Sequence, residues 1–289
     1  MNFLPAIINL RKKHQRGSYL LPGYYKLIFL CLTLANIFEF MKTVFLKITS
    51  VFLWCWFLIS SVLLTPILAL LWLLTSWFDK NLRILHLFSC FWGAQYIWVN
   101  PFWKLKITGR ENLKKGKTYL MVSNHQSLVD IIVIYSIFRH FRWTSKAENF
   151  KLPFVGWVLA ANRSIRIYRA SPKAFQLFHD QAVNALKSGN SLMVFPEGTR
   201  SPDGEMGNFK DGSFHIAQEM GVDILPMVLD GSSKAIPKKG WSLTGKQNIR
   251  LKILPSVSSS DENIAYKELR RKVYTIISDE LNRMRKEDS

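Results

Sequence analysis

The chain has 289 residues, enough for one large domain or for one domain with an appendage. Its 39 Lys and Arg residues outnumber 20 Asp and Glu residues, and the formal net charge of +19 indicates an acidic partner, either nucleic acid or an anionic membrane surface. The sequence lacks zinc-finger spacing, an RRM-like aromatic motif and basic-region heptads, which argues against a nucleic-acid-binding protein. Cys31, Cys55 and Cys90 have no paired spacing, so neither a disulfide framework nor a zinc site is expected.

The first hundred residues favour a membrane protein. Residues 27–38 form a short apolar run, and residues 51–74 form an apolar stretch of 24 residues without a charge, long enough to span a bilayer. Basic residues flank both runs, and tryptophans lie near the ends of the longer one. We expect a hairpin or a pair of helices in one leaflet, which keeps both ends on the cytoplasmic side and brings the basic flanks to anionic lipids. A single span is the alternative.

The sequence divides into three parts. Residues 1–26 form a basic lead, residues 27–103 the membrane-anchoring helices, and residues 104–289 a globular domain. The last part of the anchor, from residue 81 to 103, remains apolar and aromatic and suits a helix lying at the membrane interface. Alternation with a period of two from residue 103 to 109 predicts the first strand of the globular domain.

Strands and helices alternate through the globular domain. Strands are expected at 119–122, 141–146, 164–169, 191–195, 223–229 and 249–254, and helices at 128–138, 171–188, 212–220 and 264–281. Repeated alternation of this kind predicts an α/β fold with a mostly parallel sheet covered by helices.

A His–Asp pair follows the first buried strand. The apolar residues 119–122 lead into a polar turn that contains His125, and Asp130 follows five residues later. Strand-to-helix turns are where open α/β sheets place their ligand crevices. If His125 lies in the turn and Asp130 in the first helical turn, the carboxylate can accept from one imidazole nitrogen and leave the other free to take a proton. The alternative is a histidine at a helix N-terminus and an aspartate favoured there by the helix dipole.

A second polar turn follows the strand at 191–195. Gly198 allows the backbone to approach a ligand closely, Thr199 offers a hydroxyl, and Arg200 offers a guanidinium suited to a phosphate. Further cations are Lys146, Arg163, Arg166, Arg169 and Lys210. Each of these could be a solvated surface charge, but together with the His–Asp pair they predict a base near an anionic substrate.

Four blocks then occur in order: Asn124-His125-x-x-x-x-Asp130, Ile167-Tyr168-Arg169, Phe195-Pro196-Glu197-Gly198-Thr199-Arg200-Ser201 and Leu225-Pro226-Met227-Val228. Over roughly residues 105 to 255 they resemble the glycerolipid acyltransferase family, most closely the 1-acyl-glycerol-3-phosphate acyltransferases. The resemblance implies transfer of a fatty acyl group from acyl-CoA or acyl carrier protein to the free sn-2 hydroxyl of 1-acyl-glycerol-3-phosphate, giving phosphatidic acid in phospholipid synthesis. It implies no cofactor.

The resemblance also implies roles for individual residues. His125 matches the general base and Asp130 the carboxylate that orients it. The substrate-binding residues it implies are Glu197, Gly198, Thr199, Arg200, Arg169 and Lys210. Arg163 and Arg166 depart from the family pattern, which usually has a glycine and an aromatic or aliphatic residue there, so these cations could alter the acceptor head group. No grouping of metal ligands is found in the sequence, and no metal requirement is expected.

Other functions remain open. The chain could transfer acyl groups to another lysolipid acceptor, such as one with a larger head group. It could also be a catalytically inactive, membrane-docked lipid-binding protein, although intact His125 and Asp130 argue against this. A nucleic-acid binder at the membrane is the weakest alternative.

Overall fold

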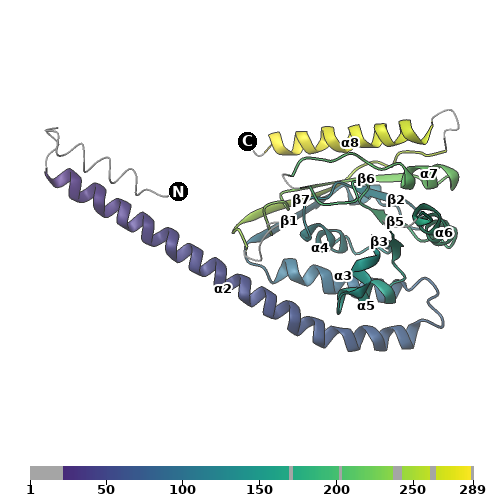
Figure 1. Cartoon of the computed structure of the whole chain (residues 1–289), viewed down its shortest axis with the longest axis horizontal. Helices are drawn as coiled ribbons and strands as arrows, with labels where there is room; N and C mark the ends of the chain where they lie inside the picture. The colour runs from purple at the N-terminus through teal and green to yellow at the C-terminus, as the bar shows by residue number, and fades with distance from the viewer. Residues whose placement is uncertain (1–21, 169–171, 202–203, 237–242, 261–264, 288–289) are drawn as a thin grey trace. The chain divides into compact units, whose positions relative to one another are not determined.

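The computed structural model describes residues 22–168, 172–201, 204–236, 243–260 and 265–287 (Figure 1). The chain forms two compact units, Met1–Val51 and Phe52–Ser289. Helix α2 (Pro22–Thr75) supplies the described part of the first unit and continues into the second.

Helix α2 corrects one expectation, because both apolar runs lie in one continuous helix and no hairpin separates them. The segment between the runs contains neither glycine nor proline. The hydroxyl of Thr43 donates to the carbonyl of Glu39, four residues earlier, and so stays within the helix instead of ending it. From Leu27 to Thr75 the helix has the length and hydropathy expected of a membrane-crossing helix.

In the second unit, the last part of α2 pairs with helix α3 (Arg83–Trp98). Leu68, Leu85 and Trp92 pack together between them, and the hydroxyls of Ser60 and Tyr96 are 2.9 Å apart. Helix α3 was expected at the membrane interface, but one of its faces is buried in the domain, where the helix packs against α4 (Val129–Tyr135). The other face stays exposed and apolar, with Ile84, Leu87, Phe91 and Trp98.

In the described part of the chain, seven strands form one sheet in the order β1-β7-β6-β2-β5-β3-β4. The strands are β1 (Trp103–Thr108), β2 (Leu120–Ser123), β3 (Arg142–Lys146), β4 (Ile165–Ile167), β5 (Leu192–Val194), β6 (Ile224–Asp230) and β7 (Gln247–Ile253). Within this sheet, β6 and β7 pair antiparallel and the other neighbours pair parallel. The predicted α/β fold with a mostly parallel sheet is therefore confirmed.

Helices cover both faces of the sheet (Figure 1). The remaining helices are η1 (Arg110–Asn112), η2 (Ala147–Lys151), α5 (Val155–Ala161), α6 (Ala174–Lys187), α7 (Gly212–Glu219) and α8 (Tyr266–Lys286). Alternate residues of the central strands feed two separate cores: Met121 lies in the core that includes α4, whereas Leu120 and Val122 lie in the core that includes α6, α7 and α8. Both faces of these strands are buried, which explains their continuous apolar runs.

Element ends differ more from expectation than element types do. The helix expected to reach residue 138 ends at Tyr135, because Phe138 adopts a left-handed conformation with φ 55°. The helix expected from Ser171 begins at Ala174 in the structure, and Ser171 itself lies outside the described residues.

Two buried histidines predict sensitivity to acid. Burial, and then the neighbouring His140, lower the pKa of His86 to about 3, and burial also lowers the pKa of His140. The unfolded chain takes up protons near pH 6.5 that these folded rings do not accept, so their contribution to stability is present above pH 6.5 and is lost as the pH falls. Between about pH 6 and pH 4, His86 should add a slope of about 1.4 kcal/mol per pH unit to the free energy of unfolding, and His140 should add to it in the same direction.

The variant His86→Phe tests this expectation through the free energy of chemical unfolding, measured in detergent between pH 6 and pH 4. The pH slope of the free energy of unfolding should fall by about 1.4 kcal/mol per pH unit relative to the wild-type chain, which corresponds to one proton. An unchanged slope would show that His86 titrates normally in the fold.

Candidate active site

The candidate site lies at the carboxyl ends of three neighbouring strands, β6, β2 and β5. His125 follows β2, Glu197 follows β5, and Ser232 follows β6. Because these strands run parallel, the residues after them meet at one edge of the sheet.

His125 and Asp130 are in contact. The imidazole Nδ1 lies 2.9 Å from the Asp130 Oδ2, as the five-residue spacing requires, with His125 in the turn and Asp130 in the first turn of α4. The Asp130 side chain is fully buried, whereas that of His125 is 14% exposed. When Nδ1 donates to the carboxylate, Nε2 is the nitrogen left to accept a proton from a bound molecule.

Surrounding groups fix the orientation of both side chains. The Asp130 carboxylate also accepts the N–H of Gln126 at 2.6 Å, the N–H of Ser127 at 2.8 Å and the hydroxyl of Ser232. The ring of Phe195 stacks on the imidazole of His125, with centroids 4.0 Å apart and planes 12° apart. These contacts hold the imidazole in one plane and one tautomer before any substrate binds.

Glu197 holds the turn that carries His125. Its Oε1 accepts the backbone N–H of His125 at 2.8 Å, and its Oε2 accepts the N–H of Gly207 at 2.9 Å. The side chain is buried, and this burial raises the pKa of the Glu197 carboxyl although the two N–H donors oppose the shift. Both oxygens thus have protein donors, which suits a positioning role, whereas the sequence predicted substrate binding.

The rest of the Glu197 loop lies beside the His125 turn. Gly198 has a φ of 70°, a left-handed conformation that favours glycine, and its N–H donates to the carbonyl of Phe195. The N–H of Ser201 donates to the carbonyl of His125 at 2.9 Å, so Arg200 stands next to the His125 turn, half-buried. The side chain of Thr199 is exposed.

Among the described residues, the structure does not bring the side chains of the other predicted cations to His125. Lys210 is exposed and reaches the loop through its backbone, where its N–H donates to the carbonyl of Pro196. Arg169 lies outside the described residues. Arg163 and Arg166 belong to the edge of the sheet around β4, three strands away from β2, so the structure separates them from His125.

Comparisons with known proteins identify the family of the chain. A family model described as Acyltransferase matches residues 104–230. A chloroplastic 1-acyl-sn-glycerol-3-phosphate acyltransferase of Arabidopsis thaliana is 34% identical over 198 residues, which cover 68% of this chain and 55% of that protein. The corresponding Saccharomyces cerevisiae enzyme is 36% identical over 152 residues, 51% of this chain and 50% of that protein. The chain belongs to the acyltransferase family.

A solved structure supports the same membership. The 1-acyl-sn-glycerophosphate (LPA) acyltransferase PlsC of Thermotoga maritima superimposes with a TM-score of 0.68 at 26% identity, covering 85% of this chain and 97% of that one. The aligned stretch spans only about half the length of the Arabidopsis and yeast relatives. Family and fold follow from these matches.

Some residues of the candidate site were given no role in the sequence analysis. The side chain of Asn124 accepts the N–H of Leu229 and donates to its carbonyl, both at 2.8 Å, and so ties the end of β2 to β6. The position of Asn124 directly before His125 could have indicated that it belongs to the site. The position of Phe195 at the end of β5 could have indicated the same. Ser232, 102 residues after Asp130, gave no signal in the sequence.

Metal ligands are a separate question. Among the residues that the structure describes, no three His, Cys, Asp or Glu side chains gather as metal ligands would. The expectation of a reaction without metal or cofactor stays a prediction, which unchanged turnover in excess chelator would support.

Substitution of Glu197 separates positioning from substrate binding. Glu197→Ala leaves the N–H groups of His125 and exposed Gly207 without their acceptor, so the free energy of unfolding should fall by about 1–3 kcal/mol. We expect kcat to fall while KM for the acceptor changes little, because the imidazole loses its fixed position. Steady-state kinetics and chemical unfolding measure the two effects, with exposed Glu268→Gln as the control. A rise in KM at constant kcat would instead assign Glu197 to the substrate.

Proposed function

We propose that the chain transfers a fatty acyl group from an acyl thioester, acyl-CoA or acyl carrier protein, to the free sn-2 hydroxyl of 1-acyl-glycerol-3-phosphate. The product is phosphatidic acid, an intermediate of phospholipid synthesis. The observation that carries the proposal is the contact of His125 Nδ1 with the buried Asp130, which leaves Nε2 to take a proton. The similarity to 1-acyl-sn-glycerol-3-phosphate acyltransferases supports the choice of substrate.

The reaction follows from this geometry. A hydroxyl is a poor nucleophile until a positioned base removes its proton. His125 Nε2 takes the proton as the acceptor oxygen attacks the thioester carbonyl, and Asp130 stabilises the imidazolium that forms. The C–S bond then breaks, the new C–O ester bond remains, and the imidazolium returns the proton to the leaving thiolate. No covalent acyl-enzyme is needed.

The acceptor phosphate requires cations near His125. Arg200 is adjacent in the chain to Ser201, whose N–H donates to the His125 carbonyl, and a guanidinium can bind a phosphate through paired hydrogen bonds. Arg169 and Lys210 are the further candidates from the sequence. In this proposal Thr199 and Gly198 line the same acceptor site.

An acceptor panel tests the proposal. Purified protein is given a labelled acyl thioester and a series of lysolipids with phosphate, larger phosphodiester or uncharged head groups. Lysophosphatidate should be the preferred acceptor, with phosphatidate as the product. A preference for an uncharged acceptor would contradict the phosphate-binding role of Arg200, and a lack of turnover with every acceptor would favour a lipid-binding protein.

The proposed location is a membrane, with the active site on its cytoplasmic face. Support comes from the apolar helix α2, from the exposed apolar face of α3, and from the nearby cations Lys80 and Arg83, which suit anionic lipids. Protease added to sealed inverted vesicles should degrade the globular domain, whereas right-side-out vesicles should protect it. The reverse pattern would place the site on the other face.

A further inference from the structure

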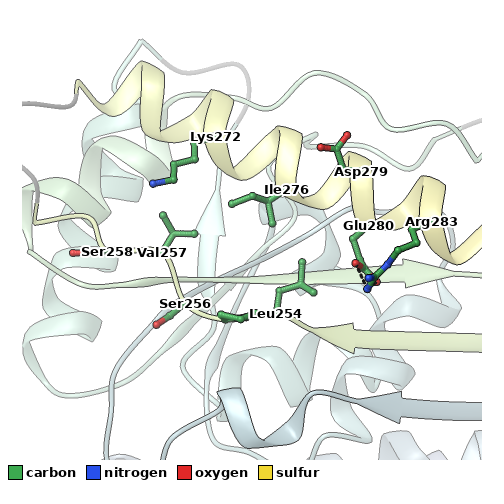
Figure 2. A pocket seen from close by; sticks show the side chains of 10 residues that line it. Leu254, Ser256, Val257, Ser258, Lys272, Ile276, Asp279, Glu280 and Arg283 are labelled. Carbon is green, nitrogen blue, oxygen red and sulfur yellow. Dashed lines mark hydrogen bonds and ion pairs between the residues drawn. The ribbon is translucent and has the colours of Figure 1, made fainter.

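Two cavities lie away from His125, and their charges differ. The larger, of about 620 Å³, lies between helix α8 and the segment after β7 (Figure 2). It contains Lys272 and Arg283, but also Asp279 and Glu280, and Arg283 forms an ion pair with Glu280 at 2.6 Å. Its charges are therefore largely balanced within the protein.

The smaller cavity, of about 360 Å³, is lined by three arginines, Arg142, Arg163 and Arg166, and is called the arginine pocket here. Phe150, Ser164 and the α6 residues Gln181 and Asn184 complete its walls. Among the described residues, no Asp or Glu lines this cavity and none forms an ion pair with these arginines.

Two buried polar atoms of the arginine pocket lack a partner among the described residues. They are the Nε of Arg142 and the hydroxyl of Ser164, whose side chain is only 8% exposed. A buried donor without an acceptor costs free energy, so a bound acceptor would stabilise the protein. Burial, and then the positive charge of Arg163, lower the pKa of the Arg142 guanidinium.

Each of the other two arginines has a contact within the protein at the pocket. The guanidinium of Arg166 lies over the ring of Phe150, 4.6 Å from its centroid, and one Nη of Arg163 donates to the carbonyl of Lys80. Arg163 adopts a left-handed conformation, with φ 50°, which is strained for a residue with a side chain. Several guanidinium groups that line one cavity are suited to a phosphate.

We propose that the arginine pocket binds a phosphate group, which lies between Arg142 and Arg163 and accepts a hydrogen bond from the hydroxyl of Ser164. The site is distinct from the reacting atoms, since β4 is three strands from β2, roughly 14 Å at the usual spacing of about 4.8 Å between strands. The phosphate belongs to a soluble phosphate compound or to the head group of an anionic phospholipid. Exposed Leu152, between η2 and α5, and exposed Val155 and Trp157, in the first turn of α5, favour the lipid.

Binding is tested without turnover, on the full chain in detergent micelles, so a failure of the proposed acyltransferase activity does not affect the result. The probes are inorganic phosphate, short-chain phosphatidate and short-chain phosphatidylcholine, and the measurement is the thermal unfolding midpoint at constant ionic strength. Inorganic phosphate should raise the midpoint of the wild-type chain. If the bound phosphate belongs to a lipid, phosphatidate should raise the midpoint at roughly tenfold lower concentration than inorganic phosphate, because its acyl chains add apolar contact. Equal potency would assign the pocket to soluble phosphate.

Three variants identify the site. Arg142→Gln and Arg163→Gln should each weaken the phosphate effect roughly tenfold, because each removes a charge-assisted hydrogen bond. Arg163 is exposed, so its variant keeps the test open if Arg142→Gln does not fold. Arg283→Gln, the same change in the balanced cavity, should leave the effect unchanged. Turnover of all three with saturating substrates should match the wild-type chain.

A phosphate effect that survives in both Arg142→Gln and Arg163→Gln would overturn the proposal and place the binding at the Arg200 site. The absence of any effect of phosphate or phosphatidate on the wild-type chain would overturn it as well.

Discussion

His125→Ala should lower kcat by a factor of roughly 10² to 10⁴, the usual contribution of a general base. The imidazole is the group whose Nδ1 contacts Asp130 and whose Nε2 is left for the acceptor hydroxyl. Its removal deletes the base but leaves the cations of the acceptor site, so the affinity for lysophosphatidate should stay within a few-fold. Turnover with a labelled acyl thioester and equilibrium binding of the acceptor are the two measurements.

The matched control for this variant is His215→Ala. His215 lies on α7 with a side chain that is 46% exposed, and its nearest carboxylate oxygen is 3.9 Å away. Its replacement should leave turnover and binding unchanged. Unchanged turnover in His125→Ala would refute the assignment of the base, and loss of both binding and turnover would indicate a structural role.

Asp130→Asn should be nearly as damaging, with a loss of roughly 10² to 10⁴ in kcat, because the side chain keeps its shape but changes the tautomer of His125. The amide can donate to Nδ1, which would leave the proton on Nε2, where the acceptor hydroxyl needs a base. The amide also faces the N–H donors of Gln126 and Ser127, which a carboxylate accepts. We therefore expect a free energy of unfolding lower by about 1–3 kcal/mol.

Two measurements separate these effects in Asp130→Asn. Chemical unfolding gives the loss of stability, and kcat at a temperature where the variant remains folded gives the loss of catalysis. Asp279→Asn, an exposed change on α8, serves as the control. Wild-type kcat in folded Asp130→Asn would contradict the role of the carboxylate in orienting His125.

The sheet was predictable because its strands carry their own signal. Apolar runs such as Leu120–Ser123 and Ile224–Asp230 are buried on both faces, and a run of this length between turn residues indicates a strand of a parallel sheet. The antiparallel pairing of β6 and β7 was not predictable, since the direction of a strand depends on the path of the chain between elements.

The membrane helices show where pattern reading fails. A hairpin or a pair of helices was expected from two apolar runs with Lys42 and Lys47 between them, but charges on an exposed face do not end a helix. Only a residue that breaks backbone hydrogen bonding or caps the chain does so, and the segment has neither glycine nor proline. Continuity of α2 follows from that local chemistry.

The candidate active site also contains contacts that the sequence predicts and contacts that it does not. Contact between His125 and Asp130 could be predicted because five residues that join a turn to the first turn of a helix fix the geometry locally. The contact of Glu197 with the N–H of His125 spans 72 residues, and that of Ser232 with Asp130 spans 102. Such partners depend on which strands become neighbours in the sheet, so the sequence identified Glu197 as part of the site but not what it touches.

In the proposed reaction, His125 acts as a base on the acceptor hydroxyl and does not itself carry the acyl group. Rapid mixing of the purified wild-type chain with acyl-CoA, followed by release of free thiol, tests this most directly. Thiol should appear only when lysophosphatidate is present, and a lysophosphatidate analogue without the free hydroxyl should give none. A burst of thiol equal to the enzyme concentration in the absence of acceptor would show an acyl-enzyme and contradict the account.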